Sequence, residues 1–594
     1  MKKLISSCLV GSTLALSSLQ GDVPPLADIA PADAPFLIDI PNIGEWQDKF
    51  LASPFYHHRD APEMEALKRF YREEIEEGLE EMLEEMGGVT LEELFSLFSL
   101  RLGATMTRPL DFGALSDDPD EYEVFTLFNG TFLLAEVGEN REAVESFFAK
   151  LEEAMADEED PHWVTEDIEI LGFPFLLEKA HPDIPESGSL ISGFWEDYFL
   201  AGIGEVAFTE TLHYLLEGGR PDSLSLESEF QSIVANLPPE QDTLFFFNVE
   251  ATFQPLFDAF VEGFQQGLGM MEAGWAENLD EILGFSTLRN FYISAGWLPE
   301  GLSVETGIRH HGKKGFFNLF TTAGPAPEIP PYFPAEASQA QLFTFSMEDF
   351  WRELQGFLDS IDPDINAQMR NGLNMMRGMG IDLEEGLIRA LGQEHFVLTF
   401  TPEELNEDIG AAIFYLVGLS LQNSAALENL IHTARMMAGP MIGDIFHETD
   451  FLGTTVVTVT DPMAMDEHGG VGFHYAFADG YFLLTIGERE SLLNFLRAKS
   501  GDLGRSFLDE PGVDQLLADF PDRGTGYTVT RTPDFIYGLW NQFYQEARKF
   551  DPDAAVAPPA KEFLAKFVGN AISIFHDEPN AFRFRYFLEI PEVE

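Results

Sequence analysis

The chain has 594 residues, of which 34 are Lys or Arg and 102 are Asp or Glu, so its formal net charge at pH 7 is −68. A negative field of this strength repels phosphate backbones and anionic lipid surfaces, which disfavours nucleic-acid binding and attachment to a membrane surface. Solubility in a salty exterior, where ions screen charge over about 8 Å or less, explains the excess of acid. The alternative is an acidic surface for a cationic partner.

The chain begins with the pattern of a secretory signal peptide. Lys2 and Lys3 precede an apolar run over 4–16, and small residues follow that run. We therefore predict that residues 1–21 are removed on export from a bacterial cell, and that the protein is periplasmic or extracellular. Cys8, the only cysteine, lies inside the apolar run; a lipid anchor there is the alternative. Without Cys8 the mature chain has no thiol for a disulfide, a metal or a nucleophile.

No later segment offers the roughly 20 uninterrupted apolar residues that a membrane-spanning helix needs. We therefore expect a soluble mature protein without a membrane span. The length of the chain predicts about two to four domains.

Strands and helices follow one another from the start of the mature chain. PADAPFLIDIPNIGEW (31–46) predicts a proline turn, an apolar strand and a helix that begins after a cap at Asn42. The spacing of apolar residues predicts a helix over 63–86, and Thr90 begins a capping box for another. The Asn-Gly pair in EVFTLFNGTFLLAEV (123–137) predicts a tight β-hairpin.

The phrase of proline turn, strand and helix cap occurs three more times, once in a weaker form. Its later copies are PPEQDTLFFFNVEATF, PAEASQAQLFTFSMEDFW and PDRGTGYTVTRTPDF, with expected caps at Asn248, Ser346 and Thr532. Two further hairpins are predicted late in the chain. HFVLTF and AAIFYLV pair across a long loop, and FADGYFLLTIG (477–487) turns at its Asp-Gly pair.

The chain also repeats longer blocks of its own sequence. YFLAGIGE (198–205) returns as YFLLTIGE (481–488), with six of eight residues identical at an offset of 283. The same offset carries NREAVESFF onto NSAALENLI, and GVTLEEL returns as GIDLEEG at an offset of 292. Because the three blocks keep their order, we interpret the chain as an internal duplication.

The proline-rich segment AGPAPEIPPYFP (323–334) is the expected connector, because proline interrupts both helices and sheets. It predicts a first half over 22–325 and a second half over 326–594. Strands occur as hairpins and also alternate with helices. This favours an α+β fold in which each half is a mixed or largely antiparallel sheet packed with helices.

No group of residues predicts a metal site. The adjacent pairs His57–His58 and His310–His311 have no carboxylate at a suitable spacing, and neighbours on a strand point to opposite faces. DPDINAQMRNGL (362–373) begins like a calcium loop but lacks its central glycine and its final glutamate. The acidic run DDPDEYE (117–123) is a solvated loop, with adventitious calcium as the alternative.

Signals for catalysis and cofactors are equally weak. GIRHHGKK (307–314) follows the phosphate-binding P-loop except for Lys314, where Ser or Thr should hold magnesium. The FFNLF that follows predicts a strand, not the helix that a P-loop needs. No nucleophile elbow is present, and among 102 acidic residues a carboxylate pair carries no information. We therefore predict a protein that is not an enzyme, with no catalytic, metal-binding or cofactor-binding residues.

Phenylalanine is abundant, with 55 residues. Methionines cluster at 375, 376 and 379 and again at 436, 437 and 441. Their helical spacing predicts core positions, where methionine fills irregular gaps. The alternative is an apolar cavity or groove for a lipid-like ligand, which phenylalanine-rich walls would suit.

The repeated phrase also carries a family resemblance. APADAPFLIDIPNIGEW, ERESLLNFL and SLSLESEFQSIVANLPPEQDTLFFFNVE resemble an uncharacterised family of secreted bacterial proteins, which typically open with a Leu-Pro-Ala-Asp-like turn into a strand. Ile29 and Ala30 stand where the family has its leucine. The resemblance implies residence outside the cytoplasm and brings no catalytic residues.

Together these patterns predict an exported, non-catalytic acidic protein that binds an unknown protein partner or an apolar small molecule. A carrier of an apolar or lipid-like ligand is the first alternative. A secreted hydrolase is the second, and it would require polar residues with shifted pKa values to converge in one half only.

Overall fold

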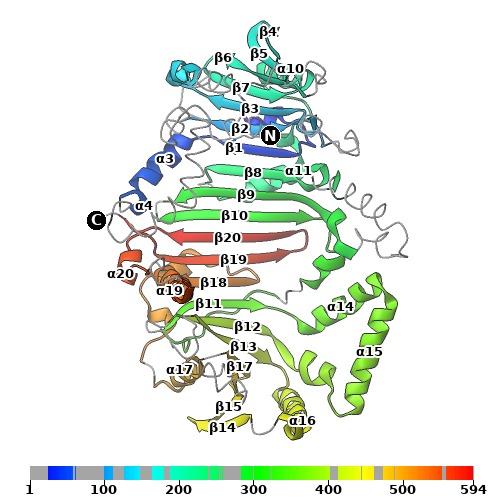
Figure 1. Cartoon of the computed structure of the whole chain (residues 1–594), viewed down its shortest axis with the longest axis vertical. Coiled ribbons are helices and arrows are strands. Elements are labelled where there is room, and N and C mark those ends of the chain that lie inside the picture. Colours follow the sequence, from blue (N-terminus) through cyan, green and yellow to red (C-terminus); the bar gives the residue numbers. More distant parts are fainter. Residues whose placement is uncertain are drawn as a thin grey trace. The chain divides into compact units, whose positions relative to one another are not determined.

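The structure is a computed structural model of the whole chain (Figure 1). It describes residues 24–57, 61, 100–110, 126–146, 164–179, 188–238, 241–252, 254, 255, 257, 282–298, 300–320, 322, 324–401, 413–442, 445–459, 473–486, 488–502, 504–550 and 557–592. The predicted signal peptide, the predicted helices over 63–86 and after Thr90, and the acidic run 117–123 lie outside these residues.

Contacts between residues divide the chain into two compact units. Unit 1 comprises Met1–Asp60, Leu67–Ala273 and Phe285–His311, and unit 2 comprises Ala61–Ala66, Gly274–Gly284 and Gly312–Glu594. The main boundary therefore falls at His311, a short distance before the proline-rich segment.

In the described residues of unit 1, ten antiparallel strands follow the order β4-β5-β6-β7-β3-β2-β1-β8-β9-β10. They are β1 (Phe36–Ile40), β2 (Leu102–Met106), β3 (Thr131–Glu136), β4 (Val164–Ile170), β5 (Phe173–Lys179), β6 (Leu190–Trp195), β7 (Tyr198–Ile203), β8 (Thr243–Asn248), β9 (Leu288–Leu298) and β10 (Gly301–His310). Its named helices are α2 (Leu26–Ile29), α3 (Ile43–Ala52), α4 (Pro54–His57), α10 (Glu205–Glu217) and α11 (Ser228–Asn236).

The main core of unit 1 lies on one face of this sheet. Alternate residues of the strands, among them Leu37 and Phe246, are buried there against α10 and α11. Phe230 of α11 meets Phe246 edge to face at 5.3 Å between ring centroids. The intervening residues, such as Ile38 and Phe245, point to the opposite face because strand side chains alternate.

The part of unit 2 that the structure describes has ten antiparallel strands in the order β14-β15-β16-β17-β13-β12-β11-β18-β19-β20. They are β11 (Ala337–Thr344), β12 (Leu391–Phe400), β13 (Phe414–Leu421), β14 (Phe446–Phe451), β15 (Thr454–Val459), β16 (Phe473–Ala478), β17 (Tyr481–Ile486), β18 (Gly526–Arg531), β19 (Asn570–Glu578) and β20 (Ala581–Glu589). Its α-helices are α14 (Met347–Ile361), α15 (Pro363–Gly378), α16 (Ser424–Ile442), α17 (Arg489–Ser500), α18 (Val513–Asp519), α19 (Thr532–Phe550) and α20 (Lys561–Leu564).

Aromatic rings fill the core between the unit 2 sheet and α17. Phe396 of β12 lies 4.8 Å from Phe333 and 5.6 Å from Phe495 of α17, measured between ring centroids. All three side chains are less than 2 % exposed. We call the face that carries them the packed face of the sheet, and the opposite face the open face. Figure 1 shows α14 leaving the end of β11, with α15 beside it.

The strand order of unit 2 repeats that of unit 1 when β1–β10 are read as β11–β20. The agreement extends to details outside the sheets. Pro31 forms an isolated bridge with Ser223, and Pro334 forms one with Ser506. The turn before β5 and the turn before β15 are both Leu-Gly pairs whose two residues have positive φ angles. Both units therefore have the predicted α+β fold with an antiparallel sheet.

The predicted helix caps are confirmed at three of the four repeated phrases. The side chain of Asn42 accepts the Glu45 amide, and Ser346 accepts the Asp349 amide. Asn248 accepts the amide of Ala251 at 3.2 Å. At the fourth phrase α19 begins at Thr532 itself. The hairpins β12–β13 and β16–β17 are confirmed as well.

The predicted hairpin over 123–137 is wrong in the part that the structure describes. Residues 126–130 form a helical turn, and only 131–136 form a strand, β3. The neighbours of β3 are β2 and β7, so no edge of β3 is free for a strand from 123–128. The amide of Thr107 instead donates to the carbonyl of Gly130 at 2.8 Å.

Candidate functional site

The open face of unit 2 contains an apolar groove with a volume of about 590 Å³. Its floor is formed by β11, β18 and β19, and its walls by residues 316–320, by Thr322 and by the start of α14. Seven phenylalanines line it: Phe316, Phe320, Phe343, Phe345, Phe350, Phe575 and Phe584. We call it the phenylalanine groove. Every residue that lines it is uncharged, although acidic residues make up 102 of the 594 in the chain.

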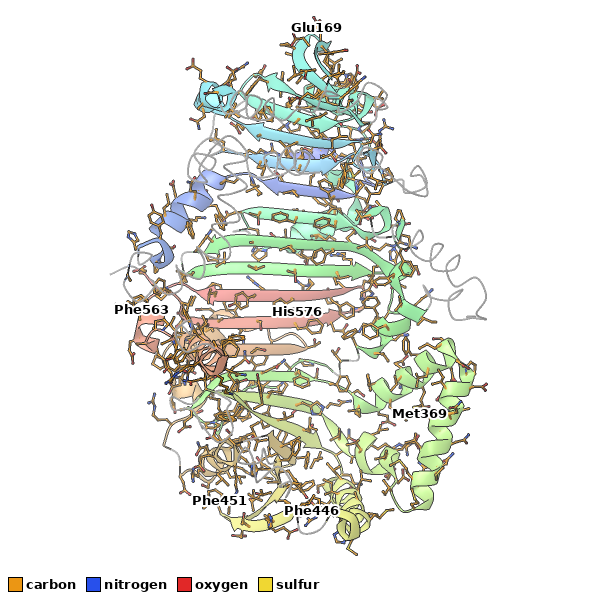
Figure 2. The ribbon with its side chains drawn as sticks, in the orientation of Figure 1. Glu169, Met369, Phe446, Phe451, Phe563 and His576 are labelled. Carbon is orange, nitrogen blue, oxygen red and sulfur yellow. The ribbon has the colours of Figure 1, made fainter. Side chains whose placement is uncertain are left out.

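One wall of the groove is held by an ion pair. The carboxylate of Asp577 on β19 lies 2.6 Å from the ammonium of Lys313 and accepts the hydroxyl of Thr322 at 2.7 Å. Lys313 also donates to the carbonyl of Phe320 at 2.7 Å and lies 4.9 Å from the ring centre of Phe582. These contacts fasten the segment that carries Phe316 and Phe320 to the sheet. Figure 2 marks His576, the neighbour of Asp577 on β19.

The floor of the groove carries a row of three polar side chains. Gln341 of β11 pairs with Thr528 of β18, and Thr528 pairs with Ser573 of β19, so the three lie side by side across the strands. All three line the groove. Within the described part of the chain none of the three side chains makes a hydrogen bond. We call them the polar row.

The equivalent row in unit 1 is apolar. Ile38 of β1 pairs with Phe245 of β8, and Phe245 pairs with Ile293 of β9. Ile38 lies seven residues after Pro31, just as Gln341 lies seven after Pro334, and both prolines form the same isolated bridge. The two sheets thus differ in chemistry at matching positions of the same face.

A second cavity of unit 2, with a volume of about 940 Å³, is lined by charged residues. Arg531 contacts Asp534 at 2.6 Å and Glu510 at 3.3 Å. Lys561 contacts Asp534 at 3.0 Å, and Arg505 contacts Glu510 at 2.7 Å. Each of these cations is therefore already paired with a carboxylate.

Glu488 lines the same charged cavity. Burial raises the pKa of the Glu488 carboxyl, and the charge of Glu490 raises it further. A cavity with such a group is what the hydrolase alternative required. However, the paired cations around it form a network that holds α19 and α20 together, which is a structural role.

Neither the described histidines nor the calcium-like segment belongs to a group of metal-ligating side chains within the described residues. His57 ends α4, and His58 lies outside the described residues. His310 is buried at the end of β10, whereas the exposed His311 lies 3.7 Å from Glu229. Asp362, the first residue of the calcium-like segment, caps α15. Among the residues described, no group of three or more His, Cys, Asp or Glu could hold a metal ion.

The P-loop-like segment does not have the strand-loop-helix conformation of a phosphate-binding loop. Its lysine, Lys313, is the residue paired with Asp577. The predicted FFNLF strand is wrong, because Gly315–Leu319 form a 3₁₀ helix, η9. Gly315 has a φ of 54°, which ends the extended backbone before this segment.

The methionine prediction is wrong for Met375, Met379, Met436 and Met437, whereas Met376 is partly buried. Met375 and Met379 on α15 are 67 % and 51 % exposed, and Met436 and Met437 on α16 are also exposed. Figure 2 shows Met369 on α15, the same helix. Helix α15 packs against α14 and still leaves Met375 and Met379 in solvent, so helical spacing alone does not bury a side chain.

No protein-family model, curated protein or solved structure matches the chain. Among the helices of the described residues, none combines the length and the apolar character that crossing a membrane requires.

Proposed function

We propose that the protein is an exported, non-catalytic binding protein, and that unit 2 holds one small, largely apolar ligand in the phenylalanine groove. The observation that carries the proposal is the groove itself, with a volume of about 590 Å³, seven phenylalanines and a wholly uncharged lining. Pockets for small molecules typically measure about 300–1,000 Å³ and are mostly apolar with a few polar groups. The lysine-led apolar run at the N-terminus supports export.

The repeated strand order supports an internal duplication as the origin of the two units. A duplicated fold can keep one copy for structure while the other copy acquires a ligand site. The polar row in unit 2 and its apolar counterpart in unit 1 are consistent with this division. The charged cavity supports the hydrolase alternative less well, because its cations are already paired.

The size of the groove sets the expected affinity. A ligand of about 25 non-hydrogen atoms gains about 0.3 kcal/mol per atom, or roughly 7.5 kcal/mol in total. This corresponds to a Kd of about 3 μM. A fluorescent apolar probe that binds with an affinity in this range is sufficient to detect the site.

The test is a titration of the mature protein with N-phenyl-1-naphthylamine, whose fluorescence rises in an apolar site. We expect saturable binding to one site, weakened about five-fold by Phe584→Ala, because Phe584 lines the groove and is 41 % exposed. The matched control is Phe473→Ala on β16, a 48 % exposed phenylalanine that does not line the groove. Equal weakening by the two variants, or no saturable binding to the unaltered protein, would contradict the proposal.

A further inference from the structure

We propose that the phenylalanine groove selects an uncharged ligand, with an apolar body and one neutral hydrogen-bonding head group such as an amide, and that the polar row recognises this head group. This inference rests on the function proposed above and names the chemical class of its ligand. The groove is too small for a protein segment with its own fold, so the occupant is a single small molecule.

The position of the polar row makes it suitable for recognition. Neighbouring strands lie about 4.8 Å apart, so Gln341, Thr528 and Ser573 span roughly 10 Å across the floor. A glutamine amide offers donors and acceptors, and each hydroxyl can donate or accept. A bound amide can therefore satisfy both its N–H and its C=O groups on this row, while the phenylalanines cover its apolar chain.

The fold itself does not require the polar row. Unit 1 builds the same sheet with Ile38, Phe245 and Ile293 at the matching positions. Isoleucine and phenylalanine are favoured in strands and would pack well among the phenylalanines of the groove. Three polar residues at the three matching positions in unit 2 therefore replace residues that serve the sheet at least as well.

The uncharged lining excludes a charged head group. A carboxylate or an ammonium group would leave water for an apolar site without an opposite charge, which is costly. Lys313 and Asp577, which hold one wall of the groove, form an ion pair with each other. This pair therefore offers no unpaired charge to a charged head group. The net charge of −68 adds a further repulsion for anions.

The test uses three ligands with the same ten-carbon chain and different head groups: decanamide, decanoate and decylamine. Each competes with N-phenyl-1-naphthylamine for the mature protein at pH 7. We expect decanamide to displace the probe at a concentration at least ten-fold lower than decanoate or decylamine. Displacement by all three at similar concentrations would overturn the inference.

A variant then assigns the preference to the polar row. Gln341→Leu, Thr528→Val and Ser573→Ala together remove its hydrogen-bonding groups with little change in size. We expect the affinity for decanamide, measured relative to the affinity for the probe in the same variant, to fall about ten-fold. Unchanged decanamide affinity would overturn the role of the row. If the triple variant does not fold, Thr528→Val alone provides the same comparison, with an expected three-fold loss.

The two proposals fail in different ways. If the probe does not bind the unaltered protein, the groove is not a ligand site and the proposed function fails. If the probe binds but head-group charge has no effect, the groove binds apolar molecules without the selectivity inferred here.

Discussion

Replacing Asp577 with asparagine tests whether one ion pair holds the wall of the phenylalanine groove. The Asp577 side chain is only 5 % exposed and contacts both Lys313 and Thr322. Asparagine keeps the size of the side chain and can still accept the Thr322 hydroxyl. The variant therefore removes the charge and little else, which leaves the ammonium of Lys313 without its counter-ion.

The expected loss of stability lies between two limits. Removing one partner of a fully buried ion pair costs about 3–5 kcal/mol, whereas an exposed pair contributes about 0–1 kcal/mol. The Lys313 side chain is 21 % exposed, so an intermediate value of about 2 kcal/mol applies. For a unit of roughly 300 residues this lowers the unfolding temperature by about 3 °C.

The assay is differential scanning calorimetry of the mature protein, combined with the probe titration. We expect Asp577→Asn to lower the unfolding temperature and to weaken probe binding about three-fold, because Phe316 and Phe320 are no longer fastened to the sheet. The control is Asp522→Asn, whose side chain is 76 % exposed, with a shift below about 0.5 °C. If Asp577→Asn changes neither quantity beyond the control, the ion pair does not hold the wall.

Three further predictions concern unit 2. Gly418→Ala should lower the free energy of unfolding by about 1–3 kcal/mol, because its new methyl group would lie 2.1 Å from the Phe396 ring; Gly356→Ala, in open space on α14, should not. Burial lowers the pKa of His395 below its ordinary 6.5. The contribution of His395 to stability is therefore complete above pH 6.5 and is lost as the pH falls through the lowered pKa. His395→Gln should reduce this loss of stability, measured by urea unfolding between pH 5 and 8, and an unchanged pH dependence would contradict the prediction. Brief peroxide treatment should oxidise Met375, which is 67 % exposed, without loss of circular dichroism, whereas protection of Met375 in a peptide map would refute its exposure.

Local signals in the sequence predicted local structure well. A helix cap requires only a side-chain oxygen placed to accept the backbone amide three residues later. Asn42 and Ser346 could therefore be identified as caps from the sequence. The β16–β17 hairpin was identifiable for the same kind of reason, since Asp479 and Gly480 both adopt the positive φ angles of its turn. These features depend on a few neighbouring residues only.

Features that depend on distant partners were not identifiable in this way. Asn129 and Gly130 form a turn, but one strand that pairs with β3 is β2, which lies more than twenty residues earlier in the chain. Met375 and Met436 follow helical spacing, yet each helix packs through one face and leaves these side chains in solvent. Periodicity shows that a helix has two faces and does not show how much of each face is covered.

The sequence predicted an apolar groove only as an alternative, and it did not indicate which residues would form it. The abundance of phenylalanine suggested an apolar cavity, but the core was the preferred explanation. A single strand does not show which of its two faces a helix covers, so Gln341 in QLFTF reads as an ordinary solvent-facing residue. Its role depends on Thr528 and Ser573, which lie about 190 and 230 residues away in the chain and meet it only through strand register.

The alignment of the repeated phrases contained a signal that is interpretable only with the strand pairing. Matching Pro31 with Pro334 places Gln341 opposite Ile38, a polar residue against an apolar one, and it also places Gln339 opposite Phe36. One such difference is unremarkable, since strands tolerate polar residues on an open face. Three differences of the same kind in one row across three strands are harder to explain by neutral change, because each removes an apolar residue from an apolar face. In a protein whose two units share one strand order, such coordinated differences indicate where the two units have different roles.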